Sequence, residues 1–169
     1  ILDKIISGGH EIAFHTMHHT KLDEKGFEEK FENELEQFDK LTSGKSKGFR
    51  APTFSLNKET SWAINHLIKK KYLYDSSIVP AKTKMYGLSD AKMYPYNISS
   101  ENILKEDNTS DLIEFPLMVT KILGKKIPAG GGFFLRFLPL RTIMNSISTY
   151  QKIDIPSTFY IHSWELVPE

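Results

Sequence analysis

The sequence predicts an α/β fold, because short apolar runs with strand character alternate with amphipathic helical runs along the chain. Short connections separate these runs, which favours parallel strands in one sheet. The chain has 169 residues, of which 40% are hydrophobic and 25% are charged. These values are ordinary for a globular protein, so we expect one domain over residues 1–169.

The clearest element is a helix at 24–42, where one apolar stripe recurs at helical spacing. The stripe consists of Phe27, Phe31, Leu35, Phe38 and Leu41. The other expected elements, in chain order, are a helix tail at 1–6 stopped by glycine, strands at 11–14 and 49–51, a helix at 57–70 that buries Trp62, Leu67 and Ile68, strands at 71–75 and 112–116, a helix at 140–150 and a buried strand at 157–161. Residues 78–111 have no clear period, which predicts an irregular excursion with a hairpin as one possibility, and 127–137 is rich in glycine and aromatic residues.

The composition excludes several classes of protein. A formal net charge of +1 argues against a nucleic-acid binder that works by bulk charge. No run of about 18 apolar residues is present, so the sequence predicts no membrane-spanning helix. The absence of cysteine excludes disulfides, thiolate nucleophiles and cysteine-type zinc sites. Any metal would therefore be held by histidine and carboxylate. Cysteine usage does not decide the cellular compartment. We predict a cytoplasmic location, with an extracytoplasmic one as the alternative.

Histidines follow the expected strand at 11–14. If residues 15–19 turn into a helix, His15 and His19 lie on one face, where two imidazoles can share one zinc ion, while His18 points elsewhere. The alternative is an ordinary polar helix start. A catalytic site of this kind also needs a carboxylate and an open water position.

Two further polar residues lie at the ends of expected strands. Arg50, one of only three arginines, could fork onto a catalytic carboxylate and hold it ionised, or could simply cap a strand edge. Asp75 could support the site or contact substrate, although Asp-Ser-Ser is also ordinary turn composition.

His162 directly follows the last expected strand and is close to Trp164 in the sequence. This placement suits a general acid, particularly if a neighbouring carboxylate tunes the imidazole, and the alternative is a half-buried histidine at a strand end. Glycines 130–132 followed by aromatic residues could let the backbone approach a sugar while a ring stacks on it, or could form a tight turn. For His10 and His66 we expect no chemical role.

Several segments resemble, in one order, the motifs of NodB-like polysaccharide deacetylases, also called carbohydrate esterase family four. Residues 9–19 resemble the family's G-H-E-[IV]-x-x-H-[ST]-x-x-H stretch, and 48–54 resemble its R-x-P-x-[FY] segment. Residues 74–77, 112–116, 130–136 and 159–166 are similar to segments of a branch associated with exopolysaccharide assembly. The resemblance covers nearly the whole chain.

The resemblance implies a deformed (β/α) barrel with a His-His-Asp metal site, usually zinc or another divalent metal. It implies that His15 and His19 are the metal ligands, that His162 is the general acid and that Arg50 orients the catalytic base. Asp75 is the third residue to which it gives a catalytic role, although the match there is less clean. The substrate-binding residues that we predict are Pro52, Phe54, Trp164 and Gly131.

The family's first motif, which supplies the catalytic base and the acidic metal ligand, has no match here. We therefore expect that residues 1–169 are the C-terminal part of a polysaccharide deacetylase-like catalytic domain whose first strand is missing from this chain. The implied function is metal-dependent removal of N-acetyl groups from the amino sugars of a polysaccharide or its precursor. The alternatives are a metal-independent amidohydrolase of the same fold that acts on a small cyclic amide, and a degenerate barrel that binds glycans.

Overall fold

A computed structural model describes residues 2–167 of the chain, which form two compact units. Unit 1 consists of Ile1–Ser77 and Tyr96–Glu114, and unit 2 consists of Ile78–Pro95 and Phe115–Glu169. The expectation of one domain over 1–169 stays a prediction. In the part of the chain that the structure describes, no helix is long and apolar enough to cross a membrane.

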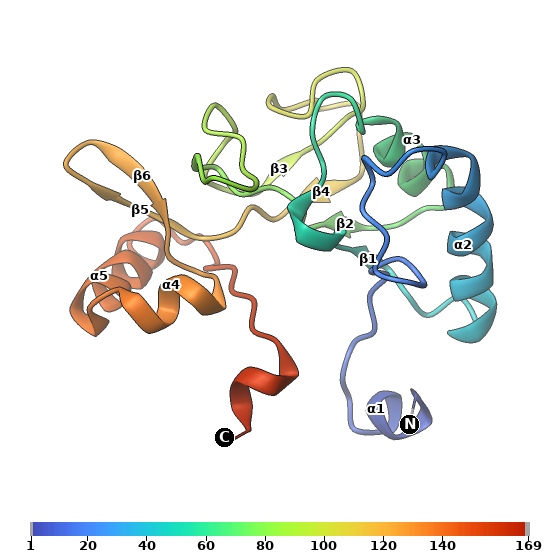
Figure 1. Cartoon of the computed structure of the whole chain (residues 1–169), viewed down its shortest axis with the longest axis horizontal. Coiled ribbons are helices and arrows are strands. Elements are labelled where there is room, and N and C mark those ends of the chain that lie inside the picture. The colour runs from blue at the N-terminus through green and yellow to red at the C-terminus, as the bar shows by residue number, and fades with distance from the viewer. Residues whose placement is uncertain (1, 168–169) are drawn as a thin grey trace. The chain divides into compact units, whose positions relative to one another are not determined.

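Unit 1 is built on a four-stranded sheet with the order β1-β2-β4-β3 (Figure 1). Its strands are β1 (Gly48–Phe49), β2 (Tyr74–Asp75), β3 (Tyr96–Asn97) and β4 (Ile113–Glu114). β1 pairs with β2 and β2 pairs with β4 in parallel, as the alternation of apolar runs predicts, while β3 runs antiparallel to β4. Phe14 adds one parallel bridge to Phe49, where a strand over 11–14 was expected.

Two helices, α2 (Glu28–Leu41) and α3 (Trp62–Lys69), pack against each other beside this sheet (Figure 1). Phe31 of α2 is fully buried, and its ring lies 5.2 Å from that of Trp62 and 5.6 Å from that of Phe49. The apolar stripe thus joins helix to helix and helix to sheet, as its spacing predicts. Leu41, the last residue of α2, does not continue the buried stripe, because its side chain is 60% exposed. Ile68 of α3 is also exposed, although it was expected to be buried.

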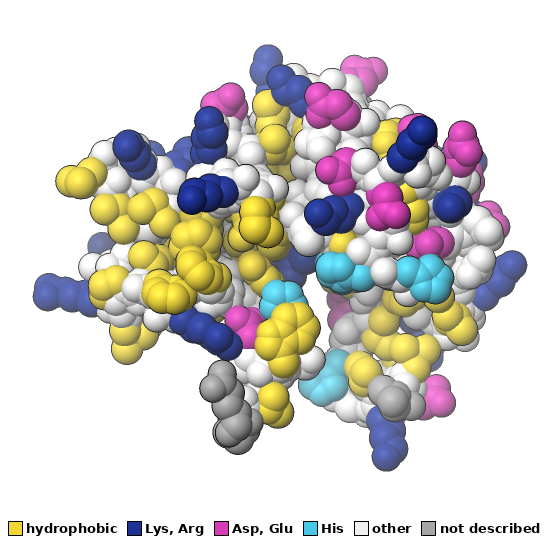
Figure 2. All heavy atoms as spheres, viewed as in Figure 1, with side chains coloured by type: hydrophobic (Ala, Val, Ile, Leu, Met, Phe, Trp, Pro, Cys, Tyr) yellow, Lys and Arg dark blue, Asp and Glu magenta, His cyan; other side chains and the backbone are white. Residues whose placement is uncertain are grey.

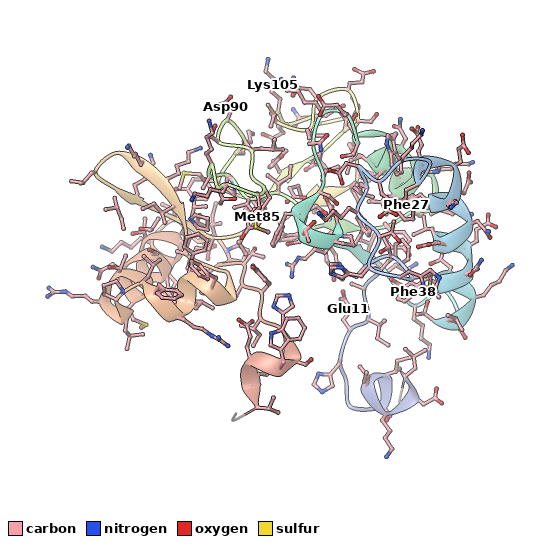
Figure 3. All side chains as sticks on the ribbon, in the orientation of Figure 1. Glu11, Phe27, Phe38, Met85, Asp90 and Lys105 are labelled. Atoms are coloured by element: carbon pink, nitrogen blue, oxygen red, sulfur yellow. The ribbon has the colours of Figure 1, made fainter. Side chains whose placement is uncertain are left out.

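The chain begins with α1 (Leu2–Ser7), which buries no residue and ends before Gly9, whose φ of 77° is left-handed. An extended segment follows, on which Figure 3 labels Glu11. The carboxylate of Glu11 accepts a hydrogen bond from the Tyr74 hydroxyl and so ties this segment to β2. Burial and this contact raise the pKa of Tyr74 well above its usual value.

Unit 2 combines a hairpin with two helices. β5 (Val119–Ile122) pairs antiparallel with β6 (Lys125–Pro128), and both turn residues, Leu123 and Gly124, have positive φ, as a two-residue hairpin requires. α4 (Gly132–Phe137) and α5 (Leu140–Gln151) follow, and α5 contacts β5. A small core of Met118, Ala129, Ile143 and Tyr150 lies between these elements.

The described strands form this open four-stranded sheet and the separate hairpin, and no closed barrel is present among them. The fold is therefore mixed α/β. Two other expectations are corrected. Residues 78–111 contribute β3 to the main sheet instead of a local hairpin. Residues 157–161 form no regular strand: Tyr160 bridges to Gly131, the Thr158 carbonyl accepts from the Met118 amide, and Phe159 and Ile161 are exposed.

Candidate functional site

In unit 1, His15 directly follows the residue that extends the sheet beside β1. The Phe14 amide donates to the Gly48 carbonyl at 2.8 Å, and the Arg50 amide donates back to the Phe14 carbonyl at 3.0 Å. These two bonds fix the backbone at the point where His15 leaves the sheet. His15 and Arg50 therefore lie next to each other at the carboxyl end of β1, although 35 residues separate them in the chain.

Residues 15–20 form an irregular loop, so the helix that the sequence allowed over 15–19 is not formed. Thr16 and His19 adopt positive φ angles of 54° and 57°, which no helix contains. The loop is held from outside, because the Met17 amide donates to the Glu34 carboxylate at 2.8 Å. It still brings the rings of His15 and His19 to 5.0 Å, centre to centre. His18 lines a separate cavity of about 330 Å³ against α2.

The rings of His15 and His19 could supply two ligands of a metal site. His15 Nδ1 lies 2.6 Å from the Arg50 carbonyl oxygen, and since a carbonyl only accepts, this nitrogen carries the proton. The other ring nitrogen is then an acceptor that can ligate a metal, in the arrangement typical of zinc-binding histidines. No group of three or more His, Asp or Glu side chains that could hold a metal occurs among residues 2–167.

Arg50 is held by the turn that follows β2. Its Nε donates to the Ser76 carbonyl at 2.9 Å, and one terminal nitrogen donates to the Ser76 hydroxyl at 2.7 Å. The guanidinium also lies over the ring of Phe54, 5.9 Å from its centre. This fixed orientation could support a further contact of Arg50 with an anionic group.

Pro52 and Phe54 belong to a short 3-10 turn, η1 (Pro52–Phe54), and both are buried. Thr53 and Phe54 adopt positive φ angles of 51° and 53°, so the backbone here is strained. In this structure the ring of Phe54 packs against the guanidinium of Arg50. The substrate-binding role of Pro52 and Phe54 stays a prediction.

Asp75, the last residue of β2, has no exposed surface. Its carboxylate accepts from the Ser77 hydroxyl at 2.5 Å, and the same hydroxyl accepts from the Ala51 amide at 2.8 Å. Its partner across the sheet is Glu114, which is equally buried. Burial raises the pKa of Asp75. Glu114 was not predicted as a site residue, although a glutamate inside the apolar strand run 112–116 was the available signal.

In unit 2, His162 begins the 3-10 turn η2 (Ser163–Leu166) and is paired with Glu165. The Glu165 carboxylate accepts from the His162 amide at 2.7 Å and lies 3.3 Å from His162 Nδ1. The backbone bond in particular lowers the pKa of Glu165. The ring of Trp164 stacks on the imidazole with centres 4.0 Å apart. Glu165 is thus the carboxylate neighbour that a general-acid histidine needs, and it too was missed as a site residue.

The glycines after β6 make room for this cluster. Gly131 is extended and bridges to Tyr160, whose ring would lie 2.5 Å from a Cβ at Gly131. A Cβ at Gly132 would lie 2.1 Å from a Glu165 carboxylate oxygen. Gly131 therefore packs against a ring of this chain, and its predicted contact with substrate is untested.

Gly132→Ala is expected to displace the Glu165 carboxylate and to break both of its contacts with His162. The substitution should shift the amide resonance of His162 strongly in an NMR spectrum, because that amide loses its charged acceptor. An unchanged His162 resonance in a folded variant would show that Glu165 does not depend on the missing Cβ.

Exposed apolar side chains gather over α4 and α5 (Figure 2). They include Phe133, Phe137, Leu140 and Met144, and the rings of Phe133 and Phe137 lie 4.5 Å apart. Arg136 of the same helix reaches Glu165 at 3.7 Å, which links this face to the His162 cluster. A cavity of about 630 Å³ lies elsewhere in unit 2, between β5 and α5, and no histidine or carboxylate is among its lining residues.

Comparisons with known proteins place the chain in a family. No curated protein matches it. A crystal structure of a putative polysaccharide deacetylase from Mycobacterium smegmatis is similar in fold, with a TM-score of 0.51 and 20% sequence identity. The likeness covers 90% of this chain but only 46% of that protein, so this chain spans less than half of its length. A family model described as "Domain of unknown function (DUF3473)" matches residues 76–169, which is more than half of the chain, and the protein therefore belongs to the DUF3473 family.

Proposed function

We propose that this protein is a hydrolase that removes acetyl groups from N-acetylated sugars of an exopolysaccharide-type polymer. The observation that carries the proposal is the pairing of His15 and His19, with His15 Nδ1 fixed by the carbonyl of Arg50. The similarity in fold to a putative polysaccharide deacetylase supports it. In this proposal the sheet of unit 1 is part of a deformed barrel, and residues 1–169 belong to one catalytic domain in the cytoplasm.

The proposed cofactor is zinc or another divalent metal, held in part by the acceptor nitrogens of His15 and His19. Such a metal would supply Lewis-acid polarisation of the acetamide carbonyl. Arg50, fixed by Ser76, would hold a catalytic carboxylate in its ionised form.

His162 would protonate the sugar amine as it leaves, because an amine is a poor leaving group without a proton. Glu165 would orient the imidazole and favour its charged form, and the stacked Trp164 would cover one ring face. We assign to Glu165 the supporting role that was expected for Asp75, because Asp75 is fully buried and is the register partner of Glu114. The exposed aromatic rings of Trp164, Phe133 and Phe137 suit the apolar faces of sugars.

An assay of acetate release tests the proposal. The zinc-loaded full chain is incubated with an N-acetylated oligosaccharide and, in parallel, with a small cyclic amide. Release of acetate that stops when the metal is chelated supports the proposal. Hydrolysis of the cyclic amide without metal would replace it by the amidohydrolase alternative, and oligosaccharide binding without any hydrolysis would replace it by the glycan-binding alternative.

A further inference from the structure

The buried carboxyl groups of Asp75 and Glu114 lie side by side in the sheet of unit 1. They are register partners on the parallel strands β2 and β4, so their side chains leave the sheet on the same face. Neither residue has any exposed surface. Two ionised carboxylates in such a place repel each other and also lose their hydration, so both cannot be charged at low cost.

One oxygen of the Asp75 carboxyl has no hydrogen bond unless a proton lies between it and the neighbouring carboxyl. The Ser77 hydroxyl donates to Asp75 Oδ1 at 2.5 Å, and the Ser77 amide donates to Glu114 Oε2 at 3.4 Å. The other oxygen of Asp75, Oδ2, is buried, and no donor within residues 2–167 reaches it. The Glu114 carboxyl is the neighbour with which Asp75 can bond, and two acceptors can bond only if one of them is protonated.

We infer that Asp75 and Glu114 act as one acid–carboxylate pair, which holds a single proton at neutral pH and positions the Ser76–Ser77 turn beneath Arg50. The inference rests on burial, strand register and the hydrogen bonds of the two carboxyls, so it holds whether or not the proposed deacetylase activity is found.

The turn transmits the position of the pair to Arg50. Ser77 binds Asp75 through its hydroxyl and the Ala51 amide through the same oxygen, at 2.5 and 2.8 Å. Ser76 binds the Arg50 side chain through its carbonyl and its hydroxyl. If the pair lost its proton, repulsion between the carboxylates would move the turn on which Arg50 rests.

Other polar groups face the pair from both neighbouring strands. The positive charge of Arg50, after β1, lowers the pKa of Asp75, but burial outweighs it and raises that pKa. On β3, Tyr96 is buried, its hydroxyl donates to the Ile103 carbonyl, and its pKa is raised, mainly by burial and further by the two carboxyls. Tyr96 is therefore neutral at pH 7 and adds no charge beside the Asp75–Glu114 pair.

Infrared spectroscopy of the full chain at pH 7 tests the shared proton directly. We expect a protonated-carboxyl band in the parent protein that disappears in Glu114→Gln and in Asp75→Asn, because an amide can donate to the remaining carboxylate and no acid proton is needed. Glu101→Gln, the same change at an exposed glutamate, should keep the band. Absence of the band from the parent protein would overturn the inference, as would its persistence in both pair variants.

The pH dependence of unfolding gives a second readout. The folded pair keeps a proton that the unfolded chain releases above about pH 4, so stability is lost as the pH rises towards the raised folded pKa. The unfolding constant should therefore increase up to about tenfold per pH unit in the parent and in Glu101→Gln, and this component should be absent from Glu114→Gln. An equal slope in Glu114→Gln would contradict the shared proton.

The positioning role is read from the side-chain Nε–H resonance of Arg50, which is tractable because the chain has only three arginines. Glu114→Gln should leave this resonance in place, and Glu114→Ala, which removes the partner of Asp75, should shift or broaden it. Equal effects of the two variants on Arg50 would reduce Glu114 to a packing residue. If Glu114→Ala fails to fold, an undisturbed resonance in Glu114→Gln, together with the loss of its carboxyl band, still supports the inference, and a disturbed one contradicts it.

Discussion

Replacement of His162 by alanine is expected to lower the turnover of deacetylation by about 10²–10⁴-fold, the usual worth of a positioned general acid. The loss should be smaller for a substrate whose leaving group is a weak base, because such a group departs without a proton. Zinc content should not change, because His162 is assigned to proton transfer. Turnover with both substrates and metal content are measured on the same preparation.

Glu165→Gln is the matched variant for this experiment. It keeps the shape of the side chain and the acceptor for the His162 amide but removes the negative charge beside Nδ1. Its turnover should fall between those of the parent and His162→Ala. A His162→Ala protein that loses metal in parallel with activity would make His162 a ligand, and one with full activity would make it a structural residue.

Arg50→Lys is expected to lower turnover by about 10- to 100-fold, which corresponds to the loss of charged hydrogen bonds worth roughly 1.5–3 kcal/mol. A lysine ammonium cannot place two donors on Ser76 and also hold a carboxylate in the fork geometry of a guanidinium. Turnover is compared with that of Arg141→Lys, which changes an exposed arginine of α5 in unit 2. Equal turnover in the two variants would show that Arg50 serves only the turn at Ser76.

The sequence predicted the helices of unit 1 well, because the spacing of Phe31 and Leu35 is a local signal and both residues are fully buried. The expected strands at 49–51 and 71–75 were longer than the two-residue strands β1 and β2 that form. The length of a strand depends on its pairing with distant segments, which a local pattern does not show. The helix considered for residues 15–19 does not form, and the reason is similar. The Met17 amide finds its acceptor in Glu34, 17 residues away, and no local pattern reveals that bond.

The sequence predicted which residues belong to the candidate site, but not the groups with which they form hydrogen bonds. His15, Arg50 and His162 stand out because each lies at the end of an expected strand or directly after one. Their partners are the Arg50 carbonyl, Ser76 and Glu165, and the first two lie 35 and 26 residues away in the chain. Glu114 is the clearest omission, since its importance depends on its register with Asp75, and register becomes visible only when the strands pair.

The central claim is that His15 and His19 ligate one metal ion, and zinc X-ray absorption of the zinc-loaded full chain tests it most directly. We expect two imidazole ligands at about 2.0–2.1 Å from zinc. His15→Ala and His19→Ala should each remove one imidazole and weaken zinc binding, while His18→Ala, on the same loop, should change neither. An unchanged imidazole shell in the His15→Ala, His19→Ala double variant, or a shell that depends on His18 instead, would contradict the account.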